Sequence, residues 1–497
     1  MSYVIGVDLG TSAVKVLLVS KTGEVVDEES KSYPLYHDQP GYSEQEPNDW
    51  VKQTKLAIKA ITDRLDDPAK IEGLSFSGQM HGLVLVDGNG EPLRRAILWN
   101  DTRTTGECRE IEQNIGLEQL HLITKNPALE GFTLPKLLWV KKHQPELFQK
   151  ASTFLLPKDY LRYCLAGDIS MDYSDAAGTL LLNVAEKAWS EEMCEKNDIP
   201  ISLCPPLVGS YQQTGTILEA VAKETGLSST CKVFAGGADN ACGAIGAGIL
   251  EDGVTLSSTG TSGVVLSYEA TGDKDFQGQV HYFNHGDPSA FYTMGVTLAA
   301  GYSLSWFKDT FAKDISFDQL VMEAKASTVG AKGLLFTPYI VGERTPHPDS
   351  AIRSSFIGVH ANHTRGDFAR AVIEGITFSL NESVEIFRSK GKKIDKVVAI
   401  GGGAKSDLWL QIQADIFNAE VVTLSNEQGP GMGAAILAAV GSGWYNKLED
   451  CANDFVSQSK IYQPIKTNVD KYQALFKLYQ QVYHSTKQLN HQLAMFR

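Results

Sequence analysis

The chain contains the same short pattern twice: a strand rich in β-branched residues, a Gly-Thr-Ser turn and a second strand. The first copy spans residues 3–19, with the turn DLGTS at residues 8–12. The second spans residues 255–266, with the turn TGTSG at residues 259–263. Strands separated by tight glycine turns are typical of hairpins, and continuation of the first copy into Val25 predicts a β-meander. Repetition of a whole unit predicts two similar halves.

Two helices of small residues form a second repeat. Residues 242–248 (CGAIGAG) and 432–438 (MGAAILA) each follow a glycine-rich approach, and side chains this small let two backbones pack closely. Together the repeats predict a duplicated α/β fold with a boundary near residue 250. We expect a first domain of residues 1–250 and a second of residues 251–497. From these strings alone, coincidence stays open as an alternative.

Composition narrows the class of protein. The 497 residues, 43% of them hydrophobic, are enough for two to four domain cores. A net charge of -14 without a basic stripe disfavours a nucleic-acid partner. The seven cysteines never form a CxxC pair, which argues against a zinc site or disulfide framework. The start of the chain has no basic signal region, and no apolar stretch of membrane-spanning length follows. We therefore expect a cytoplasmic protein with no membrane partner.

Three glycine-rich turns are candidates for binding phosphate. They lie at residues 10–12, 260–263 and 401–404, and each follows a predicted strand. Such turns present the close N–H donors that a phosphate group needs. The chain has no GxxxxGK[ST], no GxGxxG in a dinucleotide context and no protein-kinase signature. A single turn of this kind is commonly only a turn, but three at equivalent places in a duplicated frame predict phosphate binding.

Two aspartates adjoin these features. Asp8 ends a strand beside the first turn, where a carboxylate is costly unless it is paired or faces a cation, so we expect it to position Mg²⁺. Asp239 follows the strand at residues 232–234 and precedes the first small-residue helix. Phosphoryl transfer to an alcohol needs a base near the attacking hydroxyl, and Asp239 is our candidate. The alternatives are a turn-capping role for Asp8 and a helix-capping role for Asp239.

Two further strings are less specific. The strand at residues 71–76 leads into the loop GQMHG at residues 78–82, whose polar pair suits contact with a polyol, although a lone histidine is commonly structural. Residues 132–143 are compatible with a simple amphipathic helix. Another helix is expected from Pro47, with Asn48 or Asp49 as its cap.

Together these strings resemble the FGGY family of carbohydrate kinases over almost the whole chain. One family signature resembles residues 133–140 (TLPKLLWV), and the other resembles residues 342–346 (GERTP) with the spaced residues that follow. DLGTS, GGADN at residues 236–240 and GGGA at residues 401–404 add to the likeness. The GQMHG loop is similar to that of the family's ketopentose kinases, whereas its glycerol kinases carry an Arg-Glu pair at the corresponding place. One departure is Ser354, where the family pattern usually has glycine.

The resemblance implies an α/β fold of two duplicated actin/hexokinase-like (ribonuclease H-like) ATPase domains flanking a deep cleft, with ATP and Mg²⁺ as cofactors. It implies that Asp239 is the catalytic base and that Asp8 acts on the metal-nucleotide, both close to the metal. The implied sugar site comprises Met80, His81, Trp99, Asp239 and Asn240. The implied nucleotide contacts are Thr11, Ser12, Gly260, Thr261, Gly301, Gly403, Ala404 and Asp407.

The implied reaction is ATP-dependent phosphorylation of D-xylulose to D-xylulose 5-phosphate, with closure of the two domains around the substrates. Another substrate within the family, such as ribulose, gluconate or a polyol, is one alternative. A non-enzymatic ATP switch of the actin or Hsp70 kind is another, and the Asp239 and GQMHG strings argue against it. A homodimer is the family-level expectation for the assembly.

Overall fold

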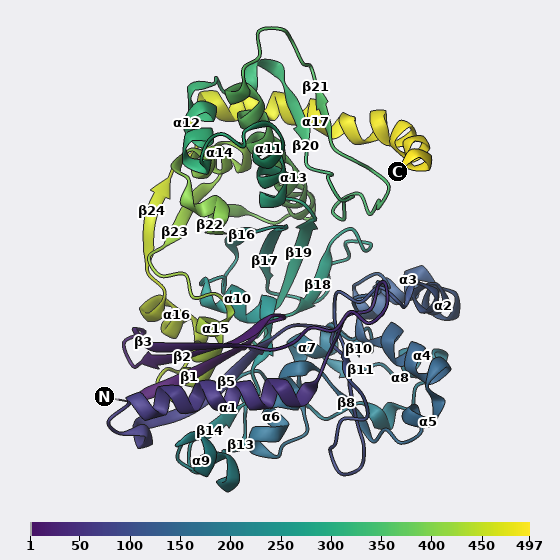
Figure 1. Ribbon diagram of the computed structural model, residues 1–497, viewed down its shortest axis with the longest axis vertical. Coiled ribbons are helices and arrows are strands. Elements are labelled where there is room, and N and C mark those ends of the chain that lie inside the picture. Colours follow the sequence, from purple (N-terminus) through teal and green to yellow (C-terminus); the bar gives the residue numbers. More distant parts are fainter. Residues whose placement is uncertain (1) are drawn as a thin grey trace.

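The computed structural model describes residues 2–497, which form two α/β lobes (Figure 1). The lower lobe in this view carries the purple to blue N-terminal half, and the upper lobe carries most of the green to yellow C-terminal half. Each lobe is built on a seven-stranded mixed sheet. In the described part of the chain, no helix is both long and apolar enough to cross a membrane.

The first sheet has the strand order β13-β14-β5-β1-β2-β3, with β15 beside β5. β1, β2 and β3 are antiparallel neighbours, which confirms the predicted meander, while β5 runs parallel to both β1 and β14. The bounds of the strands are β1 (Tyr3–Leu9), β2 (Ala13–Ser20), β3 (Val25–Ser32), β5 (Ile71–Gly78), β13 (Gln213–Thr216), β14 (Lys232–Phe234) and β15 (Gly237–Ala238).

The second sheet repeats this pattern in the order β18-β19-β17-β16-β22-β23-β24. β16 pairs antiparallel with β17 and parallel with β22, as β1 does with β2 and β5. The shared pairing confirms the predicted duplication. The bounds are β16 (Gly253–Thr259), β17 (Gly263–Glu269), β18 (His281–Asn284), β19 (Phe291–Thr297), β22 (Ile394–Gly401), β23 (Glu420–Leu424) and β24 (Gln458–Tyr462).

Helices and short ribbons complete the lobes. The first half has α1 (Pro47–Arg64), α2 (Thr105–Ile115), α3 (Leu117–Thr124), α4 (Thr133–His143), α5 (Pro145–Phe148), α6 (Pro157–Ala166), α7 (Tyr173–Ala177), α8 (Glu191–Lys196), α9 (Glu219–Thr225) and α10 (Asp239–Gly246). The second half has α11 (Gly301–Phe311), α12 (Phe317–Ala326), α13 (Arg365–Ser389), α14 (Asp407–Phe417), α15 (Pro430–Gly441), α16 (Leu448–Phe455) and α17 (Lys466–Leu493). The ribbons pair β4 (Glu44–Gln45) with β7 (Ala96–Ile97), β6 (Val84–Val86) with β8 (Thr153–Leu155), β9 (Met171–Asp172) with β12 (Leu207–Val208), β10 (Leu182–Asn183) with β11 (Ala188–Trp189), and β20 (Leu335–Thr337) with β21 (Ser355–Ile357).

The first sheet is covered on both faces. Alternate residues of β1, among them Ile5 and Val7, share a core with Trp50 and Ile58 of α1. This alternation is the period of two that a strand imposes. Helix α1 begins at Pro47 after Glu46, which makes no side-chain capping bond. The prediction that Asn48 or Asp49 caps this helix is therefore wrong, because proline at the first helical position already starts it.

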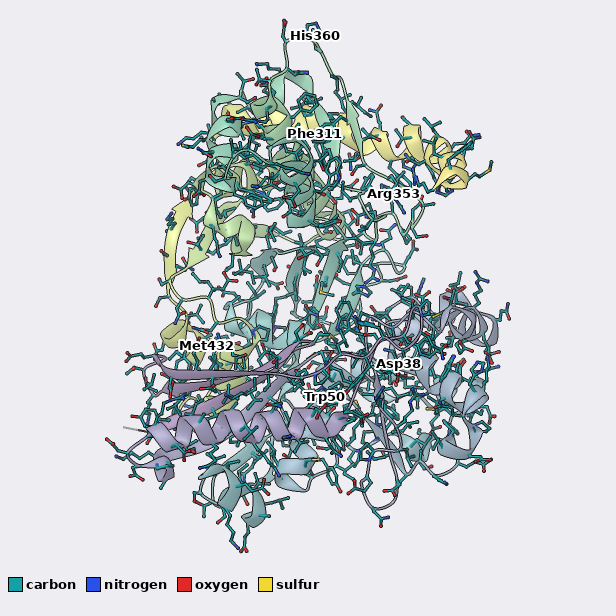
Figure 2. The ribbon with its side chains drawn as sticks, viewed as in Figure 1. Asp38, Trp50, Phe311, Arg353, His360 and Met432 are labelled. Atoms are coloured by element: carbon teal, nitrogen blue, oxygen red, sulfur yellow. The ribbon has the colours of Figure 1, made fainter. Side chains whose placement is uncertain are left out.

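The opposite face of the first sheet is covered by α15, which comes from the other end of the chain. Figure 2 shows Met432 of α15 beside the strands of the lower lobe, and Met432 shares a core with Val4 of β1. A Cβ on Gly433 would overlap the Cys242 carbonyl of α10, and one on Gly246 would lie 2.5 Å from the Gly429 oxygen. The two small-residue helices therefore pack directly against each other. The proposed domain division near residue 250 thus crosses a shared core.

Candidate active site

Two aspartates meet at the carboxyl-terminal edge of the first sheet. Asp8 lies opposite Ser77 where β1 pairs with β5, and Gly237 of β15 lies opposite the same Ser77 from the other side. Helix α10 then begins at Asp239, two residues beyond Gly237. The carboxyl ends of parallel strands are the usual location of ligand sites in open α/β sheets. The strand register therefore brings both predicted carboxylates to one edge.

The environment of these carboxylates raises their pKa values. Burial and the nearby charge of Asp8 raise the pKa of Asp239 to about 7, although the Asn240 amide, 2.7 Å away, donates to its Oδ1 and opposes the shift. Burial also raises the pKa of Asp8, against a hydrogen bond from Ser77 and the charge of Lys15. Two carboxylates in unfavourable proximity are a donor set that fits Mg²⁺, since the cation would neutralise their repulsion.

The raised pKa of Asp239 predicts an acid limit to activity. A protonated carboxyl group cannot accept a proton, so Asp239, in the role of base that the sequence analysis expects, would lose its active form as pH falls through about 7. We expect kcat/KM for Mg-ATP, which reports on the enzyme before it binds the metal-nucleotide, to fall about tenfold per pH unit below that point. Initial rates measured between about pH 5 and about pH 9 test this, and a profile flat over the whole range would contradict it.

His81 is held in an unusual backbone conformation beside this edge. Its φ is +67°, a region that non-glycine residues seldom adopt and that is often found at functional sites. Its Nδ1 lies 2.6 Å from the Gly178 carbonyl, so Nδ1 carries the proton and Nε2 is left as an acceptor. Burial lowers the pKa of His81 to about 3, which keeps the ring neutral. The His81 carbonyl accepts from Thr133 and from the fully buried Lys136, at 3.1 and 3.0 Å.

Met80 lies between the two halves of the chain. Its Sδ is 3.4 Å from Asn240 Nδ2 and 3.9 Å from the hydroxyl of Tyr292, a residue of β19 in the second sheet. Tyr292 is buried, and its ring packs on Phe283. The sequence analysis missed Tyr292, because nothing in the strand sequence FYTMGVT shows which side chain faces the opposite lobe.

A chain of side-chain hydrogen bonds joins the DLGTS turn to the GQMHG loop. The Trp99 Nε1 donates to Thr11 Oγ1 at 3.0 Å, and Thr11 donates to Gln79 Oε1 at 3.2 Å. Gln79 in turn donates to Gln45, whose own amide donates to the Thr11 carbonyl at 2.6 Å. Trp99 is 48% exposed. Trp99 therefore lies at the predicted sugar loop, and the Thr11 side chain is directed there too.

The second lobe carries a cavity of about 710 Å³ beside the second and third glycine turns. This size suits a small-molecule ligand. Five of the predicted nucleotide residues line it together: Gly260, Thr261, Gly301, Gly403 and Asp407. Its wall also has apolar and basic side chains, among them Phe317, Met322, Lys325, Lys405 and Lys460.

At the floor of this cavity, the backbone of Gly403 closely approaches the Thr259 side chain. A Cβ on Gly403 would lie 2.8 Å from the Cβ of Thr259, and the Thr259 hydroxyl is buried without a hydrogen-bond partner in the described residues. An unpartnered buried hydroxyl is costly in an empty site and useful if a ligand pairs with it. A polar ligand such as a phosphate chain therefore fits this floor.

The remaining predicted nucleotide residues lie apart from the cavity wall. Ser12 is exposed on the first turn, on the other lobe, and Ala404 lies in the third turn without lining the cavity. The Asp407 carboxylate at the rim accepts from Lys460 and Tyr462 of β24, at 2.7 and 2.6 Å. These bonds link the start of α14 to the edge of the second sheet.

Comparison with known proteins places this arrangement in a family. Residues 3–246 match the N-terminal domain of the FGGY family of carbohydrate kinases, and residues 255–442 match its C-terminal domain. The chain therefore belongs to the FGGY family of carbohydrate kinases. This confirms the predicted α/β fold of two duplicated actin/hexokinase-like domains. It also favours a sugar kinase over an ATP-driven switch.

The relatives carry more particular names. The xylulose kinase of Bacillus subtilis (strain 168) is 58% identical over 498 residues, covering 100% of both chains. A solved xylulose kinase from Lactobacillus acidophilus aligns with a TM-score of 0.93 at 28% identity, covering 98% of this chain and 99% of its own. A gluconate kinase from the same organism also aligns with a TM-score of 0.93, at 29% identity and 98% coverage of both chains.

Proposed function

We propose that this chain transfers the γ-phosphoryl group of ATP to the terminal hydroxyl of D-xylulose, giving ADP and D-xylulose 5-phosphate. The observation that carries the proposal is the position of Asp239 at the sheet edge, next to Met80 and Asn240, with a phosphate-compatible cavity in the second lobe. The identity of 58% with a xylulose kinase along the whole chain supports the choice of sugar.

In the proposed reaction, Asp239 accepts the proton of the attacking hydroxyl. Its Oδ1 is already held by both the backbone and the side-chain nitrogens of Asn240, at 2.7 and 3.0 Å, which leaves Oδ2 for the substrate. The neutral His81 offers Nε2 as an acceptor for a second sugar hydroxyl, and buried Met80 forms an apolar wall. A fixed base and fixed contacts lower the barrier by orienting the substrate.

The nucleotide is proposed to lie along the second lobe. The N–H groups of the turns at residues 260–263 and 401–404 are suited to the phosphate oxygens, and Thr259 offers its unpaired hydroxyl. Asp8 and Asp239 would hold Mg²⁺, which, when bound, neutralises charge on the transferring phosphoryl group. Closure of the lobes would exclude water, which otherwise competes with the sugar as acceptor.

The state of the cysteines bears on the location of the protein in the cell. All seven cysteines are free thiols, which supports a reducing, cytoplasmic location. A homodimer stays an expectation drawn from the family, and nothing in the chemistry above depends on it.

The choice of sugar is tested by measuring ADP release with D-xylulose, D-ribulose, gluconate and glycerol, each with and without Mg²⁺. We expect Mg²⁺-dependent turnover with D-xylulose to exceed turnover with every other compound by at least about tenfold in kcat/KM, because specificity set by hydroxyl contacts is steep. Higher turnover with gluconate would support a kinase activity but would identify gluconate, and not D-xylulose, as the substrate. Gluconate is included because a gluconate kinase is among the solved structures that align with this chain. ADP release independent of any sugar would contradict the proposal.

A further inference from the structure

A group of charged side chains is completely buried beneath the sugar loop. The Lys158 ammonium lies 2.6 Å from Asp159, 2.8 Å from Asp172 and 3.1 Å from Asp175, and all four side chains have no exposed surface. Arg162, equally buried, adds a contact of 3.3 Å with Asp159. Burying charged groups is costly unless each of them is paired and hydrogen-bonded.

This group is not a metal site. The three carboxylates lie close enough together to hold a cation, but the Lys158 ammonium already contacts each of them. Lys158 and Arg162 together compensate two of the three negative charges. Burial raises the pKa of Asp175, which favours the neutral form of this third carboxyl group. The cluster is thus a self-contained ionic core.

The cluster is connected directly to the segment that presents Asp239. Asp172 Oδ2 accepts from the hydroxyl of Ser174 at 2.5 Å, and the Ser174 Oγ accepts from the Ala238 amide at 2.9 Å. Ala238 is the residue that caps α10, immediately before Asp239. The path from the buried lysine to the backbone of the proposed base therefore has three links, Lys158–Asp172, Asp172–Ser174 and Ser174–Ala238.

Two parallel contacts hold the same segment. Asp172 Oδ2 also accepts from Ser210 Oγ at 2.9 Å, and the Ser210 carbonyl accepts from the Gly236 amide at 2.8 Å. Arg162 donates to the Ala235 carbonyl at 2.8 Å. The residues from Ala235 to Ala238 are thus held by three groups that all trace back to the buried cluster.

The same short helix also fixes His81. Helix α7 is capped at its start by Asp172, whose side chain accepts from the Ser174 amide, and Gly178 is the residue that caps its end. The carbonyl of Gly178 is the acceptor for His81 Nδ1 at 2.6 Å. A Cβ on Gly178 would lie 2.8 Å from that nitrogen, so the contact needs glycine. One rigid element therefore locates both Asp239 and the sugar-facing histidine.

We propose that α7, anchored by the buried charges, positions the active site, and that Ser174 is the positioning residue for Asp239. This inference rests on the proposed function of Asp239 as the base. Ser174 touches neither sugar nor nucleotide in this role. It fixes the start of α10, so that the carboxylate is correctly aimed when the sugar binds.

The test replaces Ser174 with alanine, which removes the acceptor for the Ala238 amide. We expect kcat to fall about 10²-fold, as for a misplaced catalytic group, with KM for D-xylulose changed less than about threefold. Ser174→Thr keeps the hydroxyl and should recover most of the rate. Hydrogen exchange, which needs no activity, should show faster exchange of the amides at residues 238–240 in Ser174→Ala.

Ser190→Ala is the matched control. The Ser190 hydroxyl caps α8 by accepting from the Met193 amide at 3.1 Å, and α8 packs against α2. The Ser190→Ala substitution should lower the melting temperature without changing kcat. An equal loss of kcat in this control, or a rate for Ser174→Ala within about twofold of the unmodified protein, would overturn the positioning role.

Two safeguards keep the test decisive. If Ser174→Ala shows no folded transition, Ser174→Cys replaces it, since the thiol fills the space of the hydroxyl but is only a weak acceptor for the Ala238 amide, and the same split between kcat and KM is expected. The unmodified protein is assayed in parallel with D-xylulose and ATP. Absence of turnover there would reject the proposed function itself, whereas normal turnover in both proteins would reject only the positioning role.

Discussion

Replacing Asp239 with asparagine is expected to lower kcat about 10³-fold, because a general base of this kind contributes between two and four powers of ten. The amide has nearly the shape of the carboxylate and can still accept from the Asn240 nitrogens, so α10 should keep its start. It cannot accept the sugar's proton. Sugar affinity, measured by calorimetry in the absence of ATP, should change only a few-fold.

Glu191→Gln is the control for this substitution. Glu191 is likewise an acidic residue at the first position of a helix, but it is exposed and lies on α8. Its neutralisation should leave kcat unchanged. If Asp239→Asn retained more than about a tenth of the rate, Asp239 would not be the base.

Replacing Gly433 with alanine is expected to destabilise the protein by about 3 kcal/mol, the upper part of the range for an overpacked contact. The added methyl would overlap the Cys242 carbonyl, and both partners are helical backbone that cannot move aside singly. Helix α10 would have to shift, and Asp239 with it. We therefore expect a lower unfolding midpoint in urea together with a reduced kcat.

The matched substitution is Gly106→Ala in α2. Gly106 has open space around its would-be Cβ, and alanine favours a helix over glycine by up to about 1 kcal/mol. Stability should therefore stay the same or rise. If Gly433→Ala behaved like Gly106→Ala, the close crossing of α10 and α15 would not be a constraint in solution.

Local signals in the sequence located the parts of this site that lie at strand ends. The DLGTS turn and the Asp239 segment both follow strands, and their glycine-rich turns and carboxylates were enough to predict a role in phosphoryl transfer. The repeated turns also predicted two similar halves, and the pairing of β1 with β5 is indeed repeated by that of β16 with β22. These signals could not predict which residue each side chain contacts.

The missed features depend on contacts between distant segments. The string around Lys158 looks like the ordinary polar start of a helix, and only its packing against the segment from Asp172 to Asp175 makes it a buried cluster. Lys136 was compatible with a simple amphipathic helix, yet it is fully buried and donates to the His81 carbonyl. A charged residue gives no sign of burial until its acceptors are known.

The packing of α15 against β1 also bears on how the chain reaches its native state during synthesis. The first sheet is translated first, but the helix that covers one of its faces is separated from it by most of the second lobe. A nascent chain that ends before residue 430 leaves Val4, Leu17 and Phe234 without their Met432 and Ile436 neighbours. The lobe that emerges first from the ribosome is therefore among the last to be completed, and until then its apolar face is available to chaperones.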